Sequence, residues 1–308
     1  MALIEIFKSK GPTGFGFGST AEEVTENLSL AGQNILITGC NSGLGLEAMR
    51  VLAMRGAHVI GTARTAEKAT EAGKKVTGTV TGVACELSDP KSVQACVETV
   101  KKLGLKLNAI ICNAGVMALP KLEQAFGYEM QFFTNHIGHF ILVTGLIDTL
   151  TDDGRVVMLS SDAHKMAPKE GIQFDNLSGE KSYGAWSAYG QSKLANMLFA
   201  KELSRRFNGT RRTAVAVHPG VIATNLMRNQ NPIGGIVMRM VSPLVLKSVA
   251  QGAATEVFAA VSPAAAKMTG EYLSDSNVAK PRSDANDPAL AQKLWVESES
   301  IVRKVLPS

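Results

Sequence analysis

The sequence is poor in cysteine and contains no long apolar run. Cysteine occurs only four times in 308 residues, without the spacing of metal ligands, so we expect no metal site and a reduced intracellular setting. No stretch of eighteen or more apolar residues occurs, so no helix is expected to cross a membrane. The N-terminus also lacks the continuous apolar segment of a secretory signal. Together these absences predict a cytoplasmic protein.

The sequence also lacks any concentration of charge of one sign. The formal net charge is +5, which is compatible with a nucleic-acid partner, but the Lys and Arg residues are scattered and form no basic block. We therefore expect no nucleic-acid partner. We interpret the positive charge as that of a basic cleft, which would attract a phosphorylated cofactor. The hydrophobic content of 45% is enough to bury one large core.

What the sequence does contain is a regular alternation of short apolar runs with longer segments of helical period. The runs are almost entirely apolar, as is typical of strands buried on both faces of a parallel sheet. Strands are predicted at residues 34–38, 58–62, 80–84, 109–112, 155–159, 213–217 and 270–273, and helices at residues 44–55, 90–103, 122–150, 185–207 and 251–260.

This alternation predicts an α/β fold of the Rossmann type, with a doubly wound parallel sheet of about seven strands and helices on both faces. No linker or internal repeat divides the chain, so we expect a single domain over residues 1–308, with an N-terminal extension at residues 1–30. Residues 162–183 and 221–250 interrupt the alternation. Long irregular connections in a compact domain commonly serve as binding loops or lids.

A glycine-rich turn joins the first predicted strand to the first predicted helix. Glycine permits positive φ and lets the backbone approach a pyrophosphate closely, and the helix N-terminus offers free N–H groups. The spacing G-x-x-x-G-x-G between a strand and a helix favours a dinucleotide-binding loop over an ordinary turn. The predicted cofactor contacts in this loop are Gly39, Asn41, Ser42, Gly43, Leu44 and Gly45.

The end of the second strand bears on the choice between the two nicotinamide cofactors. An acidic residue there would bond the ribose 2′-hydroxyl, whereas an Arg accommodates a 2′-phosphate. The sequence has Arg64 at this point and no acid before Glu67. A guanidinium forms paired, charge-assisted hydrogen bonds with phosphate, so NADP(H) is favoured over NAD(H). The alternative is that Arg64 only ends the strand at the surface.

Two further strand ends carry residues suited to an adenosine. Glu86 and Leu87 follow the third strand, where a carboxylate can meet the adenine amino group. Asn113, Ala114 and Gly115 follow the fourth, where small residues let the chain pass beside the ribose. Ligands in open α/β sheets bind outside the carboxyl ends of the strands. We therefore expect these residues to complete the cofactor site.

Tyr189 and Lys193 form a Y-x-x-x-K pair in a predicted helix. Residues four apart share one helix face, so the phenol and the ammonium point into the same space. A phenol has an ordinary pKa of about 10, and a neighbouring cation lowers it by favouring the phenolate. The pair therefore predicts an acid/base, with Lys193 also able to bond a ribose hydroxyl. Such a pair also occurs by chance in helices.

A pair of serines, Ser160 and Ser161, closes the fifth strand on the same carboxyl edge of the sheet. A hydroxyl there can hydrogen-bond a substrate carbonyl oxygen as charge develops on it, and Ser161 is the better placed of the two. Asn135 lies in the predicted helix at residues 122–150. A buried Asn in a helix needs partners, and one such role is to hold a water that links Lys193 to solvent.

Two histidines follow Asn135 in the same predicted helix. His136 and His139 have the i, i+3 spacing of a metal pair, but the sequence provides no further His or carboxylate set to complete a site. We therefore expect structural roles for both.

Six motifs occur in a fixed order between Thr38 and Thr224: T-G-x-x-x-G-x-G, N-A-G, N-H-x-G-H-F, S-S, Y-x-x-x-K and H-P-G-x-x-x-T. In this combination the chain resembles the short-chain dehydrogenase/reductase superfamily. The resemblance implies a catalytic tetrad of Asn135, Ser161, Tyr189 and Lys193. It also implies that Pro219, Gly220, Val221 and Thr224 contact the nicotinamide side of the cofactor.

Further stretches resemble the retinol dehydrogenase and WW-domain oxidoreductase group, and equally a chloroplast inner-envelope translocon component with its bacterial relatives. These stretches include Ala188–Asn196 and Gly270–Ser276. This resemblance implies preference for NADP(H) and a lipophilic alcohol, ketone or aldehyde as substrate, such as a retinoid or steroid. It also implies a homo-oligomer formed through the helices at residues 122–150 and 185–207. The sequence departs from the usual pattern at Cys112 and Glu86, and the second departure makes the adenine contact less certain.

Residues 231–246 are rich in Met and branched aliphatics and are broken by Gly and Pro. Methionine adapts to irregular apolar ligands, so residues 221–250 are predicted to form a lid over a lipophilic substrate. The alternatives are a helix pair packed on the body, a hydrophobic partner surface or a peripheral membrane contact. For the whole chain, the sequence favours an alcohol dehydrogenase or carbonyl reductase. The alternative is a cofactor-sensing binding protein of an assembly, with little or no turnover.

Overall fold

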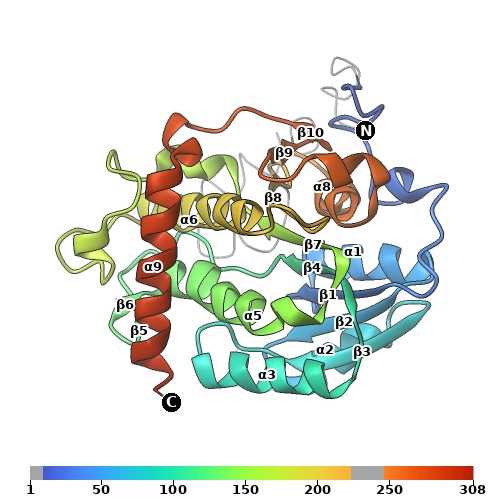
Figure 1. Cartoon of the computed structure of the whole chain (residues 1–308), viewed down its shortest axis with the longest axis horizontal. Coiled ribbons are helices and arrows are strands. Elements are labelled where there is room, and N and C mark those ends of the chain that lie inside the picture. The colour runs from blue at the N-terminus through green and yellow to red at the C-terminus, as the bar shows by residue number, and fades with distance from the viewer. Residues whose placement is uncertain (1–9, 223–245, 308) are drawn as a thin grey trace, which may run out of the picture.

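The computed structural model describes residues 10–222 and 246–307 (Figure 1). In this part of the chain, eight strands form one sheet in the order β10-β9-β8-β7-β4-β1-β2-β3, and every neighbouring pair is parallel except β9 and β10. The strands are β1 (Asn34–Thr38), β2 (His58–Ala63), β3 (Thr79–Ala84), β4 (Leu107–Cys112), β7 (Leu150–Leu159), β8 (Thr213–His218), β9 (Tyr272–Ser274) and β10 (Asn277–Val278). A separate hairpin consists of β5 (Gln124–Ala125) and β6 (Tyr128–Glu129).

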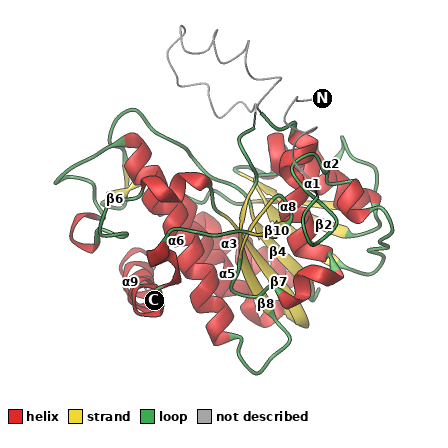
Figure 2. Ribbon diagram, turned by 90° about the horizontal axis from the view of Figure 1, so that it is seen from above, coloured by secondary structure: helices red, strands yellow, loops and turns green. Residues whose placement is uncertain are grey.

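Helices cover both faces of this sheet. Figure 2 shows α1, α2 and α8 on one side of the strands and α3, α5 and α6 on the other, with α9 outermost. The helices are α1 (Gly43–Met54), α2 (Ala66–Gly73), α3 (Pro90–Lys102), α4 (Met130–Phe132), α5 (Gly138–Leu146), α6 (Ala185–Arg206), α8 (Val249–Val261) and α9 (Pro288–Val305). The predicted doubly wound α/β fold is therefore confirmed.

The continuous apolar runs become strands because each strand is covered on both faces. In β1, Ile35 and Ile37 pack into the core under α1 and α8, whereas Leu36 packs into the core under α3, α5 and α6. Alternate residues of a strand point to opposite faces, so both sets must be apolar. All seven predicted strands are present, and the eighth, β10, adds an antiparallel edge that the sequence did not indicate.

The prediction of one helix over residues 122–150 was wrong. The segment begins with the β5–β6 hairpin, whose turn residues Phe126 and Gly127 both have positive φ. A helix then starts at Met130, because the Glu129 carboxylate accepts the Phe132 N–H at 2.8 Å. It passes through a π-helical turn, η3 (Phe133–Ile137), into α5, and β7 already begins at Leu150. The apolar period of 3.6 identified the middle of the segment, but the hairpin turn and the N-cap decide where the helix begins.

Helix α9 was not predicted, and it covers α6. Asp287 caps its N-terminus, and Pro288 occupies the first helical position, which needs no N–H donor. Trp295 of α9 packs against Phe140 of α5 and Phe199 of α6, with ring centroids 5.0 Å and 5.5 Å away. The Arg206 guanidinium lies 3.8 Å from the centre of the same indole. Part of the helix surface that we expected to form a homo-oligomer is thus covered by the chain's own C-terminal helix (Figure 1).

A Trp295→Ala variant should lower the free energy of unfolding by about 3–5 kcal/mol, because it removes a large buried side chain and leaves a cavity between three helices. Circular dichroism during urea denaturation measures this change. The matched control is Trp186→Ala, which removes the chain's other tryptophan at a position that is 42% exposed. We expect the control to change stability by no more than about 0.5 kcal/mol. Equal losses in both variants would contradict the packing role of Trp295.

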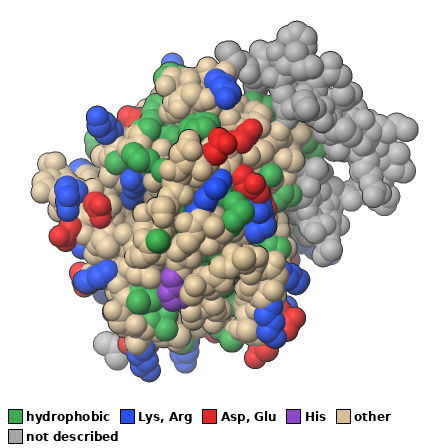
Figure 3. Space-filling view, turned by 90° about the vertical axis from the view of Figure 1, so that its right-hand side faces the viewer, with side chains coloured by type: hydrophobic (Ala, Val, Ile, Leu, Met, Phe, Trp, Pro, Cys, Tyr) green, Lys and Arg blue, Asp and Glu red, His purple; other side chains and the backbone are tan. Residues whose placement is uncertain are grey.

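The N-terminal extension packs along α8 as far as the structure describes it. Its short helical turn carries a reciprocal cap, in which Thr20 N–H donates to Glu23 and Glu23 N–H donates to Thr20 Oγ. On the face shown in Figure 3, acidic and basic side chains lie among one another, so positive charge is not concentrated there. Among the described residues, no helix is long and apolar enough to cross a membrane.

Candidate active site

The carboxyl ends of β4, β7 and β8 and the start of α1 surround the larger of two cavities in the described residues, which has a volume of about 470 Å³. Nine of the predicted site residues line it: Leu44, Asn113, Gly115, Ser161, Tyr189, Lys193, Pro219, Gly220 and Val221. The other predicted residues in the described part of the chain lie outside its lining, in the glycine loop, at the ends of β2 and β3, and at Ala114 and Asn135. Thr224 lies outside the described residues.

The glycine loop has the backbone geometry that its sequence predicts. Gly39 and Gly43 have φ of +75° and +59°, a region that side chains disfavour. A β-carbon on Gly45 would lie 2.4 Å from the Gly39 carbonyl oxygen, so only glycine allows α1 to start this close to β1. Ser42, the N-cap of α1, makes no side-chain capping bond. The first N–H groups of α1 are therefore available to an anionic group at this end of the helix.

The ends of β2 and β3 lie farther along the same sheet edge. Arg64 directly follows β2 and is exposed, and no hydrogen bond or ion pair with the described residues holds its guanidinium. The Glu86 carboxylate after β3 accepts hydrogen bonds from the backbone N–H and hydroxyl of Ser88. Leu87 lies against the first residue of α5: a β-carbon on Gly138 would lie 2.4 Å from the Leu87 carbonyl oxygen. These residues do not line the large cavity, and their contact with a cofactor stays a prediction.

The segment after β4 is tied to the start of the glycine loop. Asn113 Nδ2 donates to the Thr38 carbonyl at 2.7 Å, and Ala114 N–H donates to the Thr38 hydroxyl at 3.0 Å. A β-carbon on Gly115 would lie 2.9 Å from Asn135 Oδ1 and 3.5 Å from Lys193 Nζ. The absence of a side chain at Gly115 therefore lets Lys193 reach the wall of the cavity and lets Asn135 pack directly against Gly115.

The two serines after β7 have different surroundings. Ser160 is buried, and its hydroxyl donates to the Lys193 carbonyl at 2.8 Å, which fixes β7 to α6. Both serines line the cavity, but Ser161 is only partly buried. Helix α6 approaches the Ser161 segment closely, since a β-carbon on Gly190 would lie 2.5 Å from the Ala163 carbonyl oxygen. This close approach places Tyr189 beside Ser161.

Tyr189 is 9% exposed, and burial raises its pKa to about 12, while a hydrogen bond with the Ser161 side chain acts in the opposite direction. Burial lowers the pKa of Lys193 to about 8. The ammonium lies 5.6 Å from the centre of the Tyr189 ring and donates to the Leu159 carbonyl at 2.9 Å. The lowering of the Tyr189 pKa that we expected from Lys193 is therefore not found in this structure. The bond to β7 instead holds the Lys193 ammonium beside the Tyr189 ring.

Asn135 lies in the π-helical turn, and its side-chain amide is fully occupied. Oδ1 accepts the Val116 N–H at 2.8 Å, and Nδ2 donates to the Val116 carbonyl and to the Ser192 hydroxyl, both at 2.9 Å. The amide thus fixes the segment after β4 to α6. The water that we expected Asn135 to hold stays a prediction.

The end of β8 forms the remaining wall of the cavity. Gly220 has a φ of +90°, and a β-carbon there would lie 2.6 Å from the Lys247 side chain. Val221 is 56% exposed at the rim. Thr224 and residues 223–245 of the predicted lid lie outside the described residues.

The structure adds two residues that sequence reasoning missed. Trp186 and Met166 line the cavity and are 42% and 55% exposed. His218, which the sequence places in the H-P-G motif near the edge of the site, also lines the cavity, and it accepts the Asp162 N–H through Nδ1 at 3.3 Å. Trp186 and Met166 lie in segments whose sequence gives no indication of which way they face.

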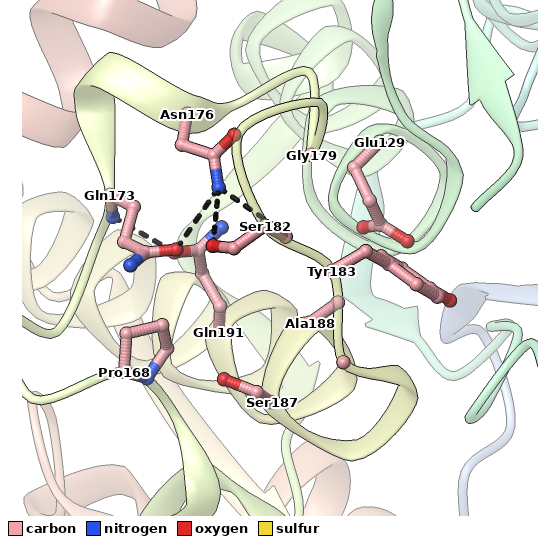
Figure 4. Close-up of a pocket in the computed structure, with 11 residues that line it drawn as sticks. Glu129, Pro168, Gln173, Asn176, Gly179, Ser182, Tyr183, Ser187, Ala188 and Gln191 are labelled. Carbon is pink, nitrogen blue, oxygen red and sulfur yellow. Dashed lines mark hydrogen bonds between the residues drawn. The ribbon is translucent and has the colours of Figure 1, made fainter. Parts of the chain in front are cut away.

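A second described cavity, of about 240 Å³, lies beside the N-terminal end of α6 (Figure 4). Its walls are polar, and many of its groups bond one another. Asn176 Nδ2 donates to Ser182 and to Gln173, and Gln191 Oε1 accepts the Gln173 N–H at 2.8 Å. None of the predicted site residues lines it. The large cavity is therefore the candidate active site.

Comparison with known proteins places these features in context. Residues 33–175 match the family described as short chain dehydrogenase. The chain is 41% identical to "Short-chain dehydrogenase TIC 32 B, chloroplastic" of Brassica napus, over 95% of each chain. It is 38% identical to retinol dehydrogenase 12 of Mus musculus, over 88% of this chain and 86% of that one. The crystal structure of an uncharacterized protein from Mycobacterium paratuberculosis superposes with a TM-score of 0.75 at 32% identity, covering 93% of this chain and 98% of that one.

Proposed function

The chain belongs to the short-chain dehydrogenase family, and we propose that it is an NADP(H)-dependent alcohol dehydrogenase or carbonyl reductase. Its reaction would transfer a hydride between the nicotinamide and a lipophilic alcohol, ketone or aldehyde. The observation that carries this proposal is the convergence of Ser161, Tyr189 and Lys193 on one cavity that lies next to the glycine loop.

The residues at the sheet edge fit a dinucleotide. Gly39 and Gly45 have no room for a side chain, and Gly43 has the positive φ that favours glycine. The start of α1 offers N–H groups to a pyrophosphate. Arg64 would hold a 2′-phosphate, while Leu87, Asn113, Ala114 and Gly115 would pass along the adenosine. Glu86 is the weakest of the proposed contacts, because Ser88 already bonds its carboxylate. Pro219, Gly220, Val221 and Thr224 would face the nicotinamide.

The bound cofactor supplies or accepts the hydride, and the chain's own groups handle the substrate oxygen and its proton. The Ser161 hydroxyl would donate a hydrogen bond to the substrate oxygen as charge develops there. The Tyr189 phenol would give its proton to that oxygen in reduction, or accept it in oxidation. The Lys193 ammonium would stabilise the phenolate and bond the ribose. Asn135 would hold the cavity wall at Gly115 and Val116 in place.

A lipophilic substrate is favoured by the side chains around the cavity mouth. Met166, Trp186 and Val221 are three large apolar residues that remain exposed, and all three line this cavity. Exposed apolar residues gathered at one place mark a binding surface. The similarity to a retinol dehydrogenase agrees with a retinoid-like or steroid-like substrate, and a lid at residues 221–250 would cover it.

The proposal is tested with purified protein, NADPH or NADP⁺, and a panel of retinoid, steroid and aromatic ketones, aldehydes and alcohols, with turnover followed by nicotinamide absorbance. We expect turnover of at least one lipophilic substrate. Tight cofactor binding without turnover of any substrate would refute the enzyme and favour the alternative, a cofactor-sensing binding protein.

Two parts of the setting remain predictions. A homo-oligomer would need a surface that α9 leaves open, and size-exclusion chromatography with light scattering measures the assembly. The cytoplasmic location was predicted from the sequence, whereas the Brassica relative is named chloroplastic. Fluorescence microscopy of the tagged chain in its native cells distinguishes the two locations.

An Arg64→Ser variant should bind NADP⁺ about 10- to 100-fold more weakly, because hydrogen bonds to a charged group contribute about 1.5–3 kcal/mol. Its affinity for NAD⁺ should change less than twofold, since NAD⁺ has no 2′-phosphate. Isothermal titration measures both affinities. The control, Lys68→Ser, removes a positive charge from an exposed position on the following helix. If Arg64→Ser weakened both cofactors equally, the assignment of Arg64 to the 2′-phosphate would be wrong.

A further inference from the structure

His139 is a buried histidine that the proposed reaction does not use, and its ring bridges two parts of the candidate site. Nδ1 lies 2.9 Å from the Asn135 carbonyl oxygen, in the π-helical turn. Nε2 lies 2.9 Å from the Thr38 hydroxyl, at the end of β1 where the glycine loop begins. The ring is inaccessible to solvent. Both nitrogens therefore have protein partners only.

The partners determine where the protons lie. A carbonyl oxygen can only accept, so Nδ1 must carry the proton. Burial lowers the pKa of His139 to about 4, so the ring is neutral near pH 7 and Nε2 accepts the Thr38 hydroxyl proton. The Thr38 oxygen in turn accepts the Ala114 N–H at 3.0 Å. The result is a continuous chain of hydrogen bonds from Ala114 through Thr38 and His139 to Asn135.

These hydrogen bonds connect three segments whose relative positions the proposed site depends on. Thr38 begins the cofactor loop, Ala114 lies in the segment that would pass beside the ribose, and Asn135 fixes Val116 and Ser192. The position of the ring is set by packing, because the adjacent Gly138 lies directly against the Leu87 carbonyl. π-Helical turns occur mainly as local bulges, often at functional sites. The ring gives the Asn135 carbonyl in this turn a fixed donor.

We propose that His139 is a positioning residue, which couples the cofactor loop to the Asn135 turn without touching cofactor or substrate. This inference rests on the proposed function, since it assigns a role within that site. A substitution that removed the ring nitrogens would take one hydrogen bond from the buried Asn135 carbonyl and would leave the Thr38 hydroxyl proton without its acceptor. Both segments would then shift, and the wall of the cavity at Gly115 would shift with them.

His136 provides a matched control in the same segment. It is also inaccessible, and burial lowers its pKa to about 3. Its Nε2, however, bonds Ser298 of α9 at 2.8 Å, in the aromatic cluster that includes Phe140 and Phe199. Replacement of His136 thus perturbs the buried core to a similar degree, but away from the cofactor loop. In the described part of the chain, no cluster of potential ligands joins these histidines into a metal site.

The experiment compares His139→Phe with His136→Phe. NADPH affinity is measured by fluorescence titration, kcat and KM with a substrate found in the panel, and the melting temperature by circular dichroism. We expect His139→Phe to weaken NADPH binding about tenfold and to lower kcat at least tenfold, because two buried partners lose their hydrogen bonds. We expect His136→Phe to lower the melting temperature similarly, while its kcat and NADPH affinity stay within twofold of wild type.

Two further variants keep the inference testable if His139→Phe does not fold. His139→Gln retains a donor and an acceptor on one side chain, and we expect it to recover part of the lost affinity and kcat. Thr38→Val removes the other end of the bridge and should show the same loss of affinity. The double variant His139→Phe/Thr38→Val should then be little worse than either single variant, because residues of one network are not additive.

The state of the ring is read independently of activity. Nuclear magnetic resonance of protein with ¹⁵N-labelled histidine should show His139 as the neutral tautomer with the proton on Nδ1, unchanged between pH 5.5 and 8.5. A proton on Nε2, or a ring that titrates in this range, would overturn the inference. So would a His139→Phe variant that loses stability only. If the wild type binds NADPH but turns over nothing, the proposed reaction fails, and the affinities of the two variants still decide the role of His139. If it binds no nicotinamide cofactor, both proposals are wrong.

Discussion

A Tyr189→Phe variant is expected to lose about 10²- to 10⁴-fold in turnover, the range that a positioned general acid or base contributes. The change removes only the phenolic hydroxyl and leaves the ring packed against Trp186, whose centroid lies 6.2 Å away. The hydroxyl is the group beside Ser161 that can exchange a proton with the substrate oxygen. NADPH affinity should stay within about threefold, so the loss should appear in kcat. Steady-state kinetics and fluorescence titration separate the two quantities.

Tyr183→Phe is the matched control for this variant. Burial raises the pKa of Tyr183 to about 12 as well, but its hydroxyl donates to the Leu119 carbonyl at 2.6 Å, and the residue lines the smaller cavity. We expect the control to cost a small amount of stability and to leave kcat within twofold of wild type. A Tyr189→Phe variant with undiminished turnover would refute the proposed mechanism.

A Lys193→Met variant should lower kcat for ketone reduction roughly 100-fold. The Lys193 ammonium and a Tyr189 phenolate about 6 Å away would attract each other by about 3 kcal/mol at an effective dielectric constant of about 20. Each factor of ten in rate corresponds to about 1.4 kcal/mol. Met fills most of the same volume but cannot stabilise a phenolate. Lys201→Met is the matched control. Lys201 lies on the same helix and also donates to a backbone carbonyl, that of Gly270 at 2.8 Å, but it does not line the cavity.

The pH dependence tests the same role of Lys193. Burial lowers the pKa of Lys193 to about 8, so the ammonium is charged below this pH and loses its charge above it. Reduction also requires a protonated phenol, and a Tyr189 pKa of about 12 provides one throughout the neutral range. We expect the rate of ketone reduction to be constant at low pH and to fall as Lys193 loses its proton at pH 8 or above. The fall can lie above pH 8 because a ribose hydroxyl bonded to Lys193 favours its charged form. The fall should be absent in Lys193→Met, and its persistence there would assign it to another group.

Several features of the site could be predicted because they depend on residues close together in the chain. The glycine loop is recognisable since a strand, a turn that needs positive φ and a helix follow one another directly at Gly39–Gly45. Tyr189 and Lys193 share a helix face by their spacing alone. Local patterns failed to predict element boundaries where a hairpin and a helix are both compatible with the same few residues. The helix predicted at residues 122–150 starts too early for this reason, because its first residues form the β5–β6 hairpin.

The sequence by itself determined the alternation of strands and helices along the chain, the α/β class and the residue types at each strand end. All three follow from local periodicity and turn chemistry. The tertiary structure decided which of those residues meet. Gly190 brings Tyr189 to Ser161 only through packing against Ala163, and His139 bonds Thr38 across 101 residues of chain. Such contacts depend on how the helices pack against the sheet, because that packing must give nearly every buried polar group a hydrogen-bond partner. No local pattern contains that information.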